Sequence, residues 1–190
     1  MTLMEFSVEK YIQKHLEIIK QLDIDEINNA INLVSNAFSN EKKIIVFGNG
    51  GSALTASHFI NDWNKSIQLY TKRKFRGISL TDNIGLITSY ANDISYDEIF
   101  AGQLRSIVDP GDLVIGISGS GNSINVANGI KVANECQAET LGLVGYDGGI
   151  IKSLCNHNVW VKSFDMQLCE DAHFMIGHLI MKSMCDDPIN

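Results

Sequence analysis

A run of small polar residues, Ser118-Gly119-Ser120-Gly121-Asn122-Ser123, has the composition of a phosphate-binding loop. It follows a short apolar run over 113–117 that predicts a buried strand, and apolar residues then recur at helical spacing over 126–133. Backbone N–H groups at the start of a helix, together with the helix dipole, attract anions. A helix cap would need only one hydroxyl, whereas this loop offers three serines and an asparagine. We therefore expect a phosphate or phosphosugar site, and not a Walker loop, since no Gly-Lys-Ser/Thr follows.

A second glycine-rich loop, Gly48-Asn49-Gly50-Gly51-Ser52-Ala53, follows another predicted strand. It fits the G-x-G-x-x-A pattern of dinucleotide-binding folds, which also place an acidic residue about 20 positions further on. Asp82, the acid after the next predicted strand, lies too far along the chain, and the Ser/Gly loop has no place in that scheme. We therefore interpret Asn49 and Ser52 as side chains that hold polar parts of a smaller phosphorylated ligand.

His58 and Asp62 lie four residues apart on a helix predicted over 52–65, so their side chains share one face of that helix. A pair of this kind can bind a metal ion or divide the work of acid and base. The alternative is a half-exposed helix on which His58 only hydrogen-bonds its neighbour, and spacing by itself favours that alternative.

A helix predicted over 167–184 carries Glu170, Asp171, His173 and His178. His178 lies among apolar residues, which is typical of a core histidine rather than of a ligand. Glu170 and His178 are eight positions apart, about 12 Å along a helix axis. Since zinc ligands bind at about 2 Å, one unbroken helix cannot supply both to one ion. If both are ligands, they come from different subunits.

The elements that position these residues alternate along the chain. Strands are predicted over 43–47, 77–80, 113–117, 140–144 and 158–161, and helices over 52–65, 83–91, 96–108, 126–133, 148–154 and 167–184. Two further helices, over 8–22 and 27–38, precede the first strand, with Asp25 as the expected cap of the second. The alternation predicts an α/β fold with a parallel sheet between two helical layers. Ligands of such sheets bind beyond the carboxyl ends of the strands, so both glycine loops should face one crevice.

The composition fits a globular protein of one domain, with 190 residues, 45% hydrophobic and 19% charged. A net charge of −7 argues against a nucleic-acid-binding surface. No apolar run approaches the length of a membrane span, so we expect a cytoplasmic protein without membrane partners. The cysteines form no CxxC pair, which predicts free thiols in a reducing compartment. They are Cys136, Cys155, Cys169 and Cys185.

Taken together, these motifs resemble the sugar isomerase (SIS) domain, and within it the bacterial phosphoheptose isomerases. The resemblance rests on Phe47-Gly48-Asn49-Gly50-Gly51-Ser52, His58-Phe59, Asn92-Asp93, Ser118 to Ser123, and Glu170-Asp171-Ala172-His173 with His178. It implies a three-layer αβα SIS fold with a five-stranded parallel sheet. The single SIS domain would span 1–190, with a helical pair over 1–40 and the sheet core over 41–190. It also implies a homotetramer with sites between subunits, and often a zinc ion.

The resemblance also assigns roles to residues. Substrate would be bound by Asn49, Gly50, Gly51, Ser52, Asn92, Asp93, Ser118, Gly119, Ser120, Ser123 and Glu170, and metal by His58, Asp62, Glu170 and His178. Asp62 would transfer a proton between C1 and C2, and His178 would serve the oxygens. The implied reaction converts sedoheptulose 7-phosphate to glycero-manno-heptose 7-phosphate through an enediol, for lipopolysaccharide or capsule synthesis.

Three positions depart from the family pattern. Asp62 stands where glutamate is usual, Glu170 where glutamine is usual, and Gln167 where aspartate is usual. A displacement of about 1 Å can cost on the order of 100-fold in rate, so the sequence leaves open an altered substrate or a weakened activity. Two other functions also stay open: a non-catalytic SIS tetramer that binds a protein such as a replication initiator, and a phosphosugar sensor. Retention of His58, a carboxylate at 62 and His178 favours the enzyme.

Overall fold

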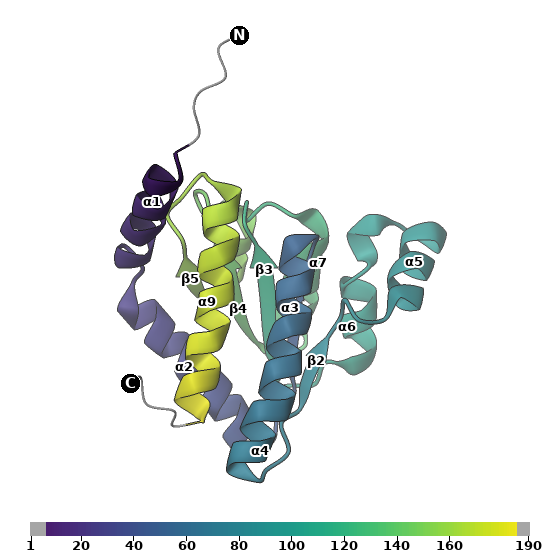
Figure 1. Ribbon diagram of the computed structural model, residues 1–190. Helices are drawn as coiled ribbons and strands as arrows, with labels where there is room; N and C mark the ends of the chain where they lie inside the picture. Colours follow the sequence, from purple (N-terminus) through teal and green to yellow (C-terminus); the bar gives the residue numbers. More distant parts are fainter. Residues whose placement is uncertain (1–6, 186–190) are drawn as a thin grey trace.

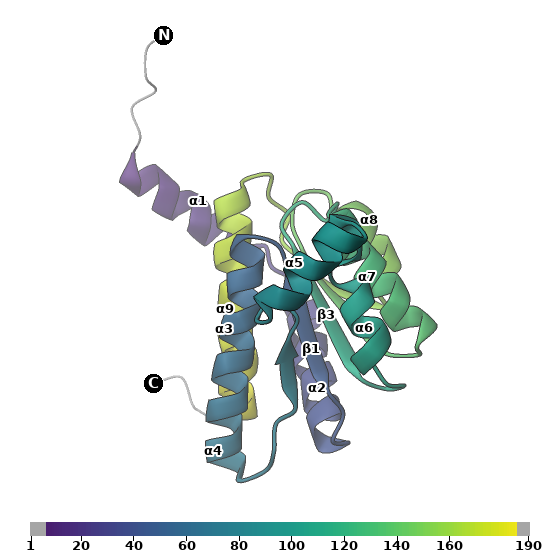
Figure 2. The same cartoon turned by 90° about the vertical axis from the view of Figure 1, so that its right-hand side faces the viewer.

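A computed structural model describes residues 7–185 and places a parallel sheet between two layers of helices (Figures 1 and 2). The strands are β1 (Ile44–Gly48), β2 (Gly77–Ser79), β3 (Leu113–Ser118), β4 (Glu139–Val144) and β5 (His157–Trp160). They pair in the order β2-β1-β3-β4-β5, and every pair is parallel. The central strands β1 and β3 are buried along their whole length because helices cover both of their faces. The predicted fold class is confirmed.

Each face of the sheet has its own hydrophobic core. One core lies under α2 (Ile24–Ser39), α3 (Gly51–Asp62) and α9 (Met166–Met184), and contains Phe59, Ile115 and Ile176. The other core lies under α6 (Ala101–Ile107), α7 (Ile124–Glu135) and α8 (Gly149–Leu154). Figure 2 shows the sheet nearly edge-on between these two sets of helices.

The strand order reverses direction at β1. From β1 the chain passes to β2 on one side, and it returns to add β3 on the other side. Gly48, the last residue of β1, pairs with Ile117, so the loops after β1 and β3 leave the sheet side by side. This is the switch point at which open parallel sheets bind their ligands, and both glycine loops lie there.

Three local expectations were wrong. The cap of α2 is Asp23, not Asp25, because the Asp23 side chain accepts from the Asp25 and Glu26 backbone N–H groups. The helix expected over 96–108 is a 3-10 turn, Tyr96–Glu98, followed by α6; the residues between them include buried Ile99 and Phe100. The helix expected over 52–65 ends as α3 at Asp62 and continues through a π-helix (Trp63–Ile67) into α4 (Gln68–Thr71).

Among residues 7–185, three α-helices contribute no buried residue: α1 (Val8–Lys20), the short α4, and α5 (Ile84–Asp93). On α1, Val8, Ile12 and Leu16 share one face and are each about half exposed. Figures 1 and 2 show α1 at the margin of the molecule, whereas α2 packs on the sheet. The apolar stripe of α1 is therefore left uncovered by the described part of the protomer.

Among residues 7–185, no helix combines the length and the apolar character that a membrane crossing requires. Cys136, Cys155 and Cys169 are free thiols, as expected. Burial raises the pKa of the Cys155 thiol to about 12, so this cysteine is not a nucleophile at neutral pH.

Candidate functional site

The Ser/Gly loop joins the end of β3 to the start of α7. Ser118 is buried, and its hydroxyl lies 3.2 Å from the hydroxyl of Ser123. Ser123 occupies the N-cap position of α7, yet its side chain makes no capping hydrogen bond. A helix-capping role therefore does not explain this serine, whose hydroxyl lies beside the start of the helix. Hydroxyls and a helix N-terminus meet here, which is the arrangement that binds phosphate groups.

The Asn122 side chain is hydrogen-bonded within the loop and to the start of α8. Its Nδ2 donates to the Ser120 carbonyl at 3.1 Å, and its Oδ1 accepts from the Ile150 backbone N–H at 3.1 Å. Gly121 has a φ of 69° and packs against Gly148, where a side chain would not fit. Asn122 and Gly121 thus pack the loop against the start of α8. The side chains that can still donate to a ligand from this loop are those of its three serines.

The loop after β1 is tied to α7 through Asn49. The Asn49 Nδ2 donates to Asn125 Oδ1 at 2.8 Å, and Asn125 Nδ2 donates back to Asn49 Oδ1 at 2.9 Å. The Tyr96 hydroxyl also donates to Asn49 Oδ1, at 3.0 Å. Asn49 of the first loop is thus bonded to the helix that begins where the Ser/Gly loop ends, and we call the region of the two loops the loop crevice (Asn49, Ser118, Ser120 and Ser123). Sequence reasoning missed Asn125 and Tyr96, because no motif links them to either loop.

Other predicted substrate-binding residues lie around the crevice. Gly50 adopts φ 53° and ψ −121°, a conformation that favours glycine, and precedes the first turn of α3. Ser52, in the first turn of α3, is buried. Asn92 and Asp93 are exposed at the end of α5, where Asn92 Nδ2 donates to Asp93 Oδ1 at 2.8 Å. In this protomer, it is Tyr96 from the same segment that reaches Asn49.

Three ionisable side chains meet where α3 and α9 lie side by side (Figure 1). His58 Nε2 lies 3.0 Å from His178 Nε2 and 3.2 Å from Asp62 Oδ2. His178 Nε2 lies 3.7 Å from the same carboxylate oxygen. All three side chains are partly exposed, between 23% and 43%. We call this group the helix seam (His58, Asp62 and His178).

Close packing of the two helices positions the seam. The Phe174 ring stacks on the His58 ring with centroids 4.4 Å apart. Gly177 lies against the Phe59 ring so tightly that a Cβ at Gly177 would overlap it. The Trp63 Nε1 donates to the Gly177 carbonyl at 3.1 Å. Trp63 also begins the π-helix, an irregularity that is frequent at functional sites.

The seam has the donor set of a catalytic metal site. One ligand atom from each of His58, Asp62 and His178 lies within 4.8 Å of the other two. Two imidazole nitrogens and a carboxylate suit zinc, and three protein ligands leave a coordination position for water or substrate. Glu170 does not belong to this group, because its carboxylate lies beside Gly51 at the start of α3. The two helical turns between Glu170 and His178 separate them, as the sequence predicted.

The core histidine of α9 is His173, whereas His178, whose apolar neighbours in the sequence are typical of a core position, does not occupy one. His173 is completely buried, and burial lowers its pKa to about 4, so it is neutral at physiological pH. The His178 side chain is 43% exposed and belongs to the seam. The two residues are five positions apart, which turns them to different sides of the helix.

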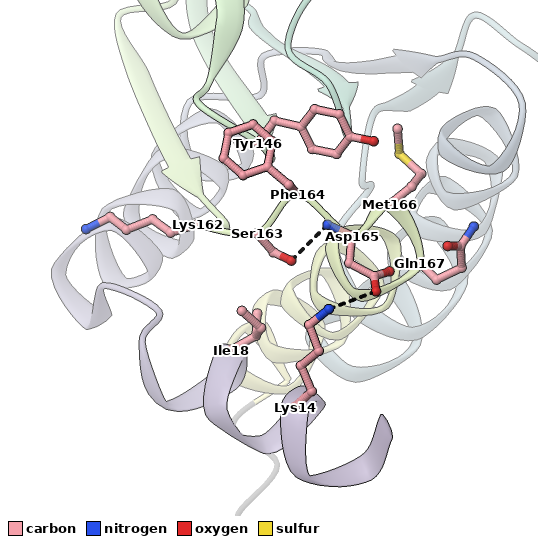
Figure 3. Close-up of a pocket in the computed structure, with 9 residues that line it drawn as sticks. All are labelled: Lys14, Ile18, Tyr146, Lys162, Ser163, Phe164, Asp165, Met166 and Gln167. Atoms are coloured by element: carbon pink, nitrogen blue, oxygen red, sulfur yellow. Dashed lines mark hydrogen bonds and ion pairs between the residues drawn. The ribbon is translucent and has the colours of Figure 1, made fainter. Parts of the chain in front are cut away.

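A hollow beside the Ser/Gly loop opens between α1 and the start of α9 (Figure 3). Lys14 Nζ pairs with Asp165 Oδ2 at 3.2 Å across it, and the Tyr146 ring packs on Phe164. Met166 lines this hollow and packs against Gly119 of the Ser/Gly loop. The hollow is lined by Lys14, Ile18, Tyr146, Lys162, Ser163, Phe164, Asp165, Met166 and Gln167.

Comparison with known proteins gives matches over most of the chain. The SIS domain family matches residues 9–145. A probable phosphoheptose isomerase of Thermoplasma acidophilum is 36% identical over 172 residues, with 90% of this chain and 94% of the relative covered. The phosphoheptose isomerase of Aliarcobacter butzleri is 37% identical over 156 residues, with 82% of each covered. The structure of the phosphoheptose isomerase of Neisseria gonorrhoeae has a TM-score of 0.86 at 26% identity, with 93% of this chain and 96% of that chain covered.

Proposed function

Because the chain belongs to the SIS-domain family and, within it, to the phosphoheptose isomerases, we propose that it converts sedoheptulose 7-phosphate to glycero-manno-heptose 7-phosphate through an enediol. The observation that carries the proposal is the helix seam, where His58, Asp62 and His178 lie within 3.7 Å of one another. A protein that only displayed a binding surface would not need two histidines and a carboxylate in mutual contact.

The loop crevice would hold the phosphate and the sugar chain. Hydroxyls of Ser118, Ser120 and Ser123 at the start of α7 supply neutral donors, and the helix dipole favours a dianion there. Asn49 would donate to the sugar through the N–H that it does not share with Asn125. Gly50 has open space where a Cβ would stand and would let the substrate approach the backbone. Gly51 and Gly119, whose Cβ positions face Glu170 and Met166, would contribute backbone N–H groups, and Ser52, Asn92 and Asp93 would complete the polar lining.

The seam would carry the proton transfer. In the ketose-to-aldose direction, Asp62 removes a proton from C1 and returns it to C2, while His178 moves a proton between the two oxygens. The two groups are close enough in this structure to act on adjacent atoms, since His178 Nε2 lies 3.7 Å from Asp62 Oδ2. Restoration of both protons leaves the enzyme unchanged after each turnover.

A zinc ion fits the same residues. His58, Asp62 and His178 would hold it, and Glu170 of a neighbouring subunit would complete the set. When bound, a zinc ion supplies Lewis-acid stabilisation of the negative charge that develops on the enediolate oxygens. A carboxylate at Glu170 in place of the usual glutamine would strengthen the hold on a divalent cation.

We further propose a homotetramer with sites between subunits, in which residues 1–190 form one SIS domain. Asp62 lies eleven residues beyond Gly51, about 16 Å along α3, so crevice and seam of one chain are well separated. The uncovered stripe of Val8, Ile12 and Leu16 on α1 supplies an apolar surface for association. A cytoplasmic role in lipopolysaccharide or capsule synthesis follows from the proposed substrate.

The test is to incubate the pure protein with sedoheptulose 7-phosphate and to follow aldose formation with zinc, with chelator, and in His178→Ala. We expect turnover that falls with chelator and is nearly lost in the variant, while light scattering reports a tetramer in both proteins. A stable tetramer without turnover under any condition would favour the non-catalytic scaffold. Metal analysis without zinc, together with a rate unchanged by chelator, would remove the metal from the proposal.

A further inference from the structure

A hollow at the end of the sheet opposite the glycine loops is lined by Glu41, Arg73, Lys74 and Arg76. We call it the basic hollow. It lies where the chain leaves α4 to begin β2, next to the end of α2, at the lower end of the molecule in Figure 1. Four of the five residues in Lys72-Arg73-Lys74-Phe75-Arg76 are cationic, although the whole chain has a net charge of −7. This concentration of positive charge plays no part in the proposed isomerase reaction.

The segment that carries these cations is firmly anchored. Phe75 is 7% exposed, stacks on Phe38 with centroids 5.8 Å apart, and meets the edge of the Trp63 ring at 6.1 Å. The Thr71 hydroxyl accepts from the Arg73 backbone N–H at 3.2 Å. Because Phe75 is fixed in the core, the cations on both sides of it are held at the surface without a large loss of backbone freedom on binding.

Backbone carbonyls also hold the two guanidinium groups in place. Arg73 Nη2 donates to the Ser39 carbonyl at 3.4 Å, and Arg76 Nη1 donates to the Glu41 carbonyl at 3.0 Å. Arg73 also lies over the Phe38 ring, 4.6 Å from its centroid. These contacts complement the negative end of α2, but they use few of the five N–H donors of each guanidinium. The remaining donors are available to a ligand.

No carboxylate forms an ion pair with Arg73, Lys74 or Arg76 in the described part of the chain, although Arg76 adds to the lowering of the Asp109 pKa that Lys43 mainly causes. Among residues 7–185, the side-chain ion pairs within 4.0 Å involve other cations, and Glu41 is the one acid that lines the hollow. Lys43 nearby shows the opposite case, because Asp109 and Asp112 hold its ammonium group on both sides. Arg73, Lys74 and Arg76 together thus present a local excess of two positive charges to solvent.

We propose that the basic hollow is a second anion site, which binds a diphosphate group and is separate from the loop crevice. Guanidinium groups bind phosphoryl oxygens through paired N–H donors, and a diphosphate group can engage two such groups and an ammonium at once. The diphosphate could be inorganic or part of a nucleotide, and both present the same oxygens to these side chains. Binding should weaken with added salt, since the site is exposed.

The test is calorimetric titration of the assembled protein with inorganic diphosphate and, separately, with ADP. Titrations are made at low salt in the presence of an equilibrated substrate–product mixture that occupies the loop crevice. We expect saturable binding of inorganic diphosphate, of ADP or of both, and at least a tenfold loss of affinity in Arg73→Gln/Arg76→Gln. Tighter binding of ADP than of inorganic diphosphate would identify a nucleotide as the ligand, and the reverse order would identify the free anion.

Lys20→Gln/Lys131→Gln is the matched control, because it removes the same charge from exposed residues elsewhere and should keep full affinity. Lys74→Glu serves as the second variant if loss of the arginines disturbs the end of α2, and it should also lower affinity at least tenfold. Absence of binding by both ligands in the wild-type protein overturns the proposal. Equal affinity in the wild type and in folded Arg73→Gln/Arg76→Gln overturns it too. These outcomes do not depend on isomerase activity, so this proposal and the proposed function can fail separately.

Discussion

The loop crevice and the helix seam hold their polar groups by different means. In the crevice, neutral amides and hydroxyls are fixed by hydrogen bonds to one another, such as the paired bonds between Asn49 and Asn125. In the seam, ionisable groups contact each other directly, and apolar packing between α3 and α9 sets their positions. Neutral donors can hold an anion without exchanging protons with it, whereas histidines and carboxylates can exchange protons near neutral pH.

The difference suggests a division of labour that kinetics can test. Changes in the crevice should act mainly on substrate affinity, whereas changes in the seam should act mainly on turnover. Damage to one region should therefore leave the function of the other region largely intact.

Removal of the seam imidazole should have the largest effect. In His178→Ala we expect kcat to fall by about 1,000-fold, within the range for loss of a general acid–base group, while KM changes by less than about threefold. Steady-state assays with sedoheptulose 7-phosphate measure both. His157→Ala is the matched control. His157 lies at the start of β5, where it pairs with Glu139 at the start of β4, away from both regions. A large rise in KM with unchanged kcat in His178→Ala would contradict the division of labour.

Sequence patterns predicted the elements that carry both regions, but not how the side chains on those elements are turned. The positions of the strands along the chain and the two glycine loops follow from local composition, because a buried strand and a small-residue turn each leave a local signature. Local composition does not show that His173 is the buried histidine and His178 the seam residue. That depends on which side of α9 meets α3 and which side meets the sheet. The π-helix after Asp62 and the contacts of Tyr96 and Asn125 depend on tertiary packing in the same way.

Close contact between α3 and α9 should be the most sensitive structural feature of the seam. A methyl group at Gly177 would overlap the Phe59 ring, so Gly177→Ala should lower the free energy of unfolding by about 2–3 kcal/mol. The helices would have to separate, so turnover should fall while binding to the crevice persists. Gly85→Ala on exposed α5 is the matched control and should be neutral or slightly stabilising. Chemical denaturation of both variants tests this, and equal stability would show that the seam tolerates separation.

The buried side of α9 should make stability depend on pH. The pKa of His173 is about 4 in the folded protein, below its ordinary value of 6.5, because the ring is buried. The unfolded chain therefore binds more protons between these values, and stability is complete above pH 6.5 and falls as the pH drops towards 4. Between pH 7.5 and 5 we expect a loss of about 2 kcal/mol from this residue.

Denaturant unfolding at the two pH values measures that loss. In His173→Leu the decrease between pH 7.5 and 5 should be smaller than in the wild type by the same amount, whatever the absolute stability of the variant. The same decrease in both proteins would assign the pH dependence to other groups. His178→Ala should retain the wild-type decrease, because His178 is partly exposed and is not the buried histidine.

The smallest expected effect comes from the hydrogen bond that orients Asn49 in the crevice. Tyr96→Phe removes the hydroxyl that donates to Asn49 Oδ1 and keeps the ring, and one neutral hydrogen bond contributes about 0.5–1.5 kcal/mol. Asn49 would stay bonded to Asn125 but could turn, so we expect KM to rise about three- to tenfold with kcat nearly unchanged. Asn125→Ala, made alone, should raise KM more than Tyr96→Phe does, because it removes the two hydrogen bonds between Asn125 and Asn49. A fall in kcat without a change in KM in Tyr96→Phe would place Tyr96 with the seam and would remove the distinction between the two regions.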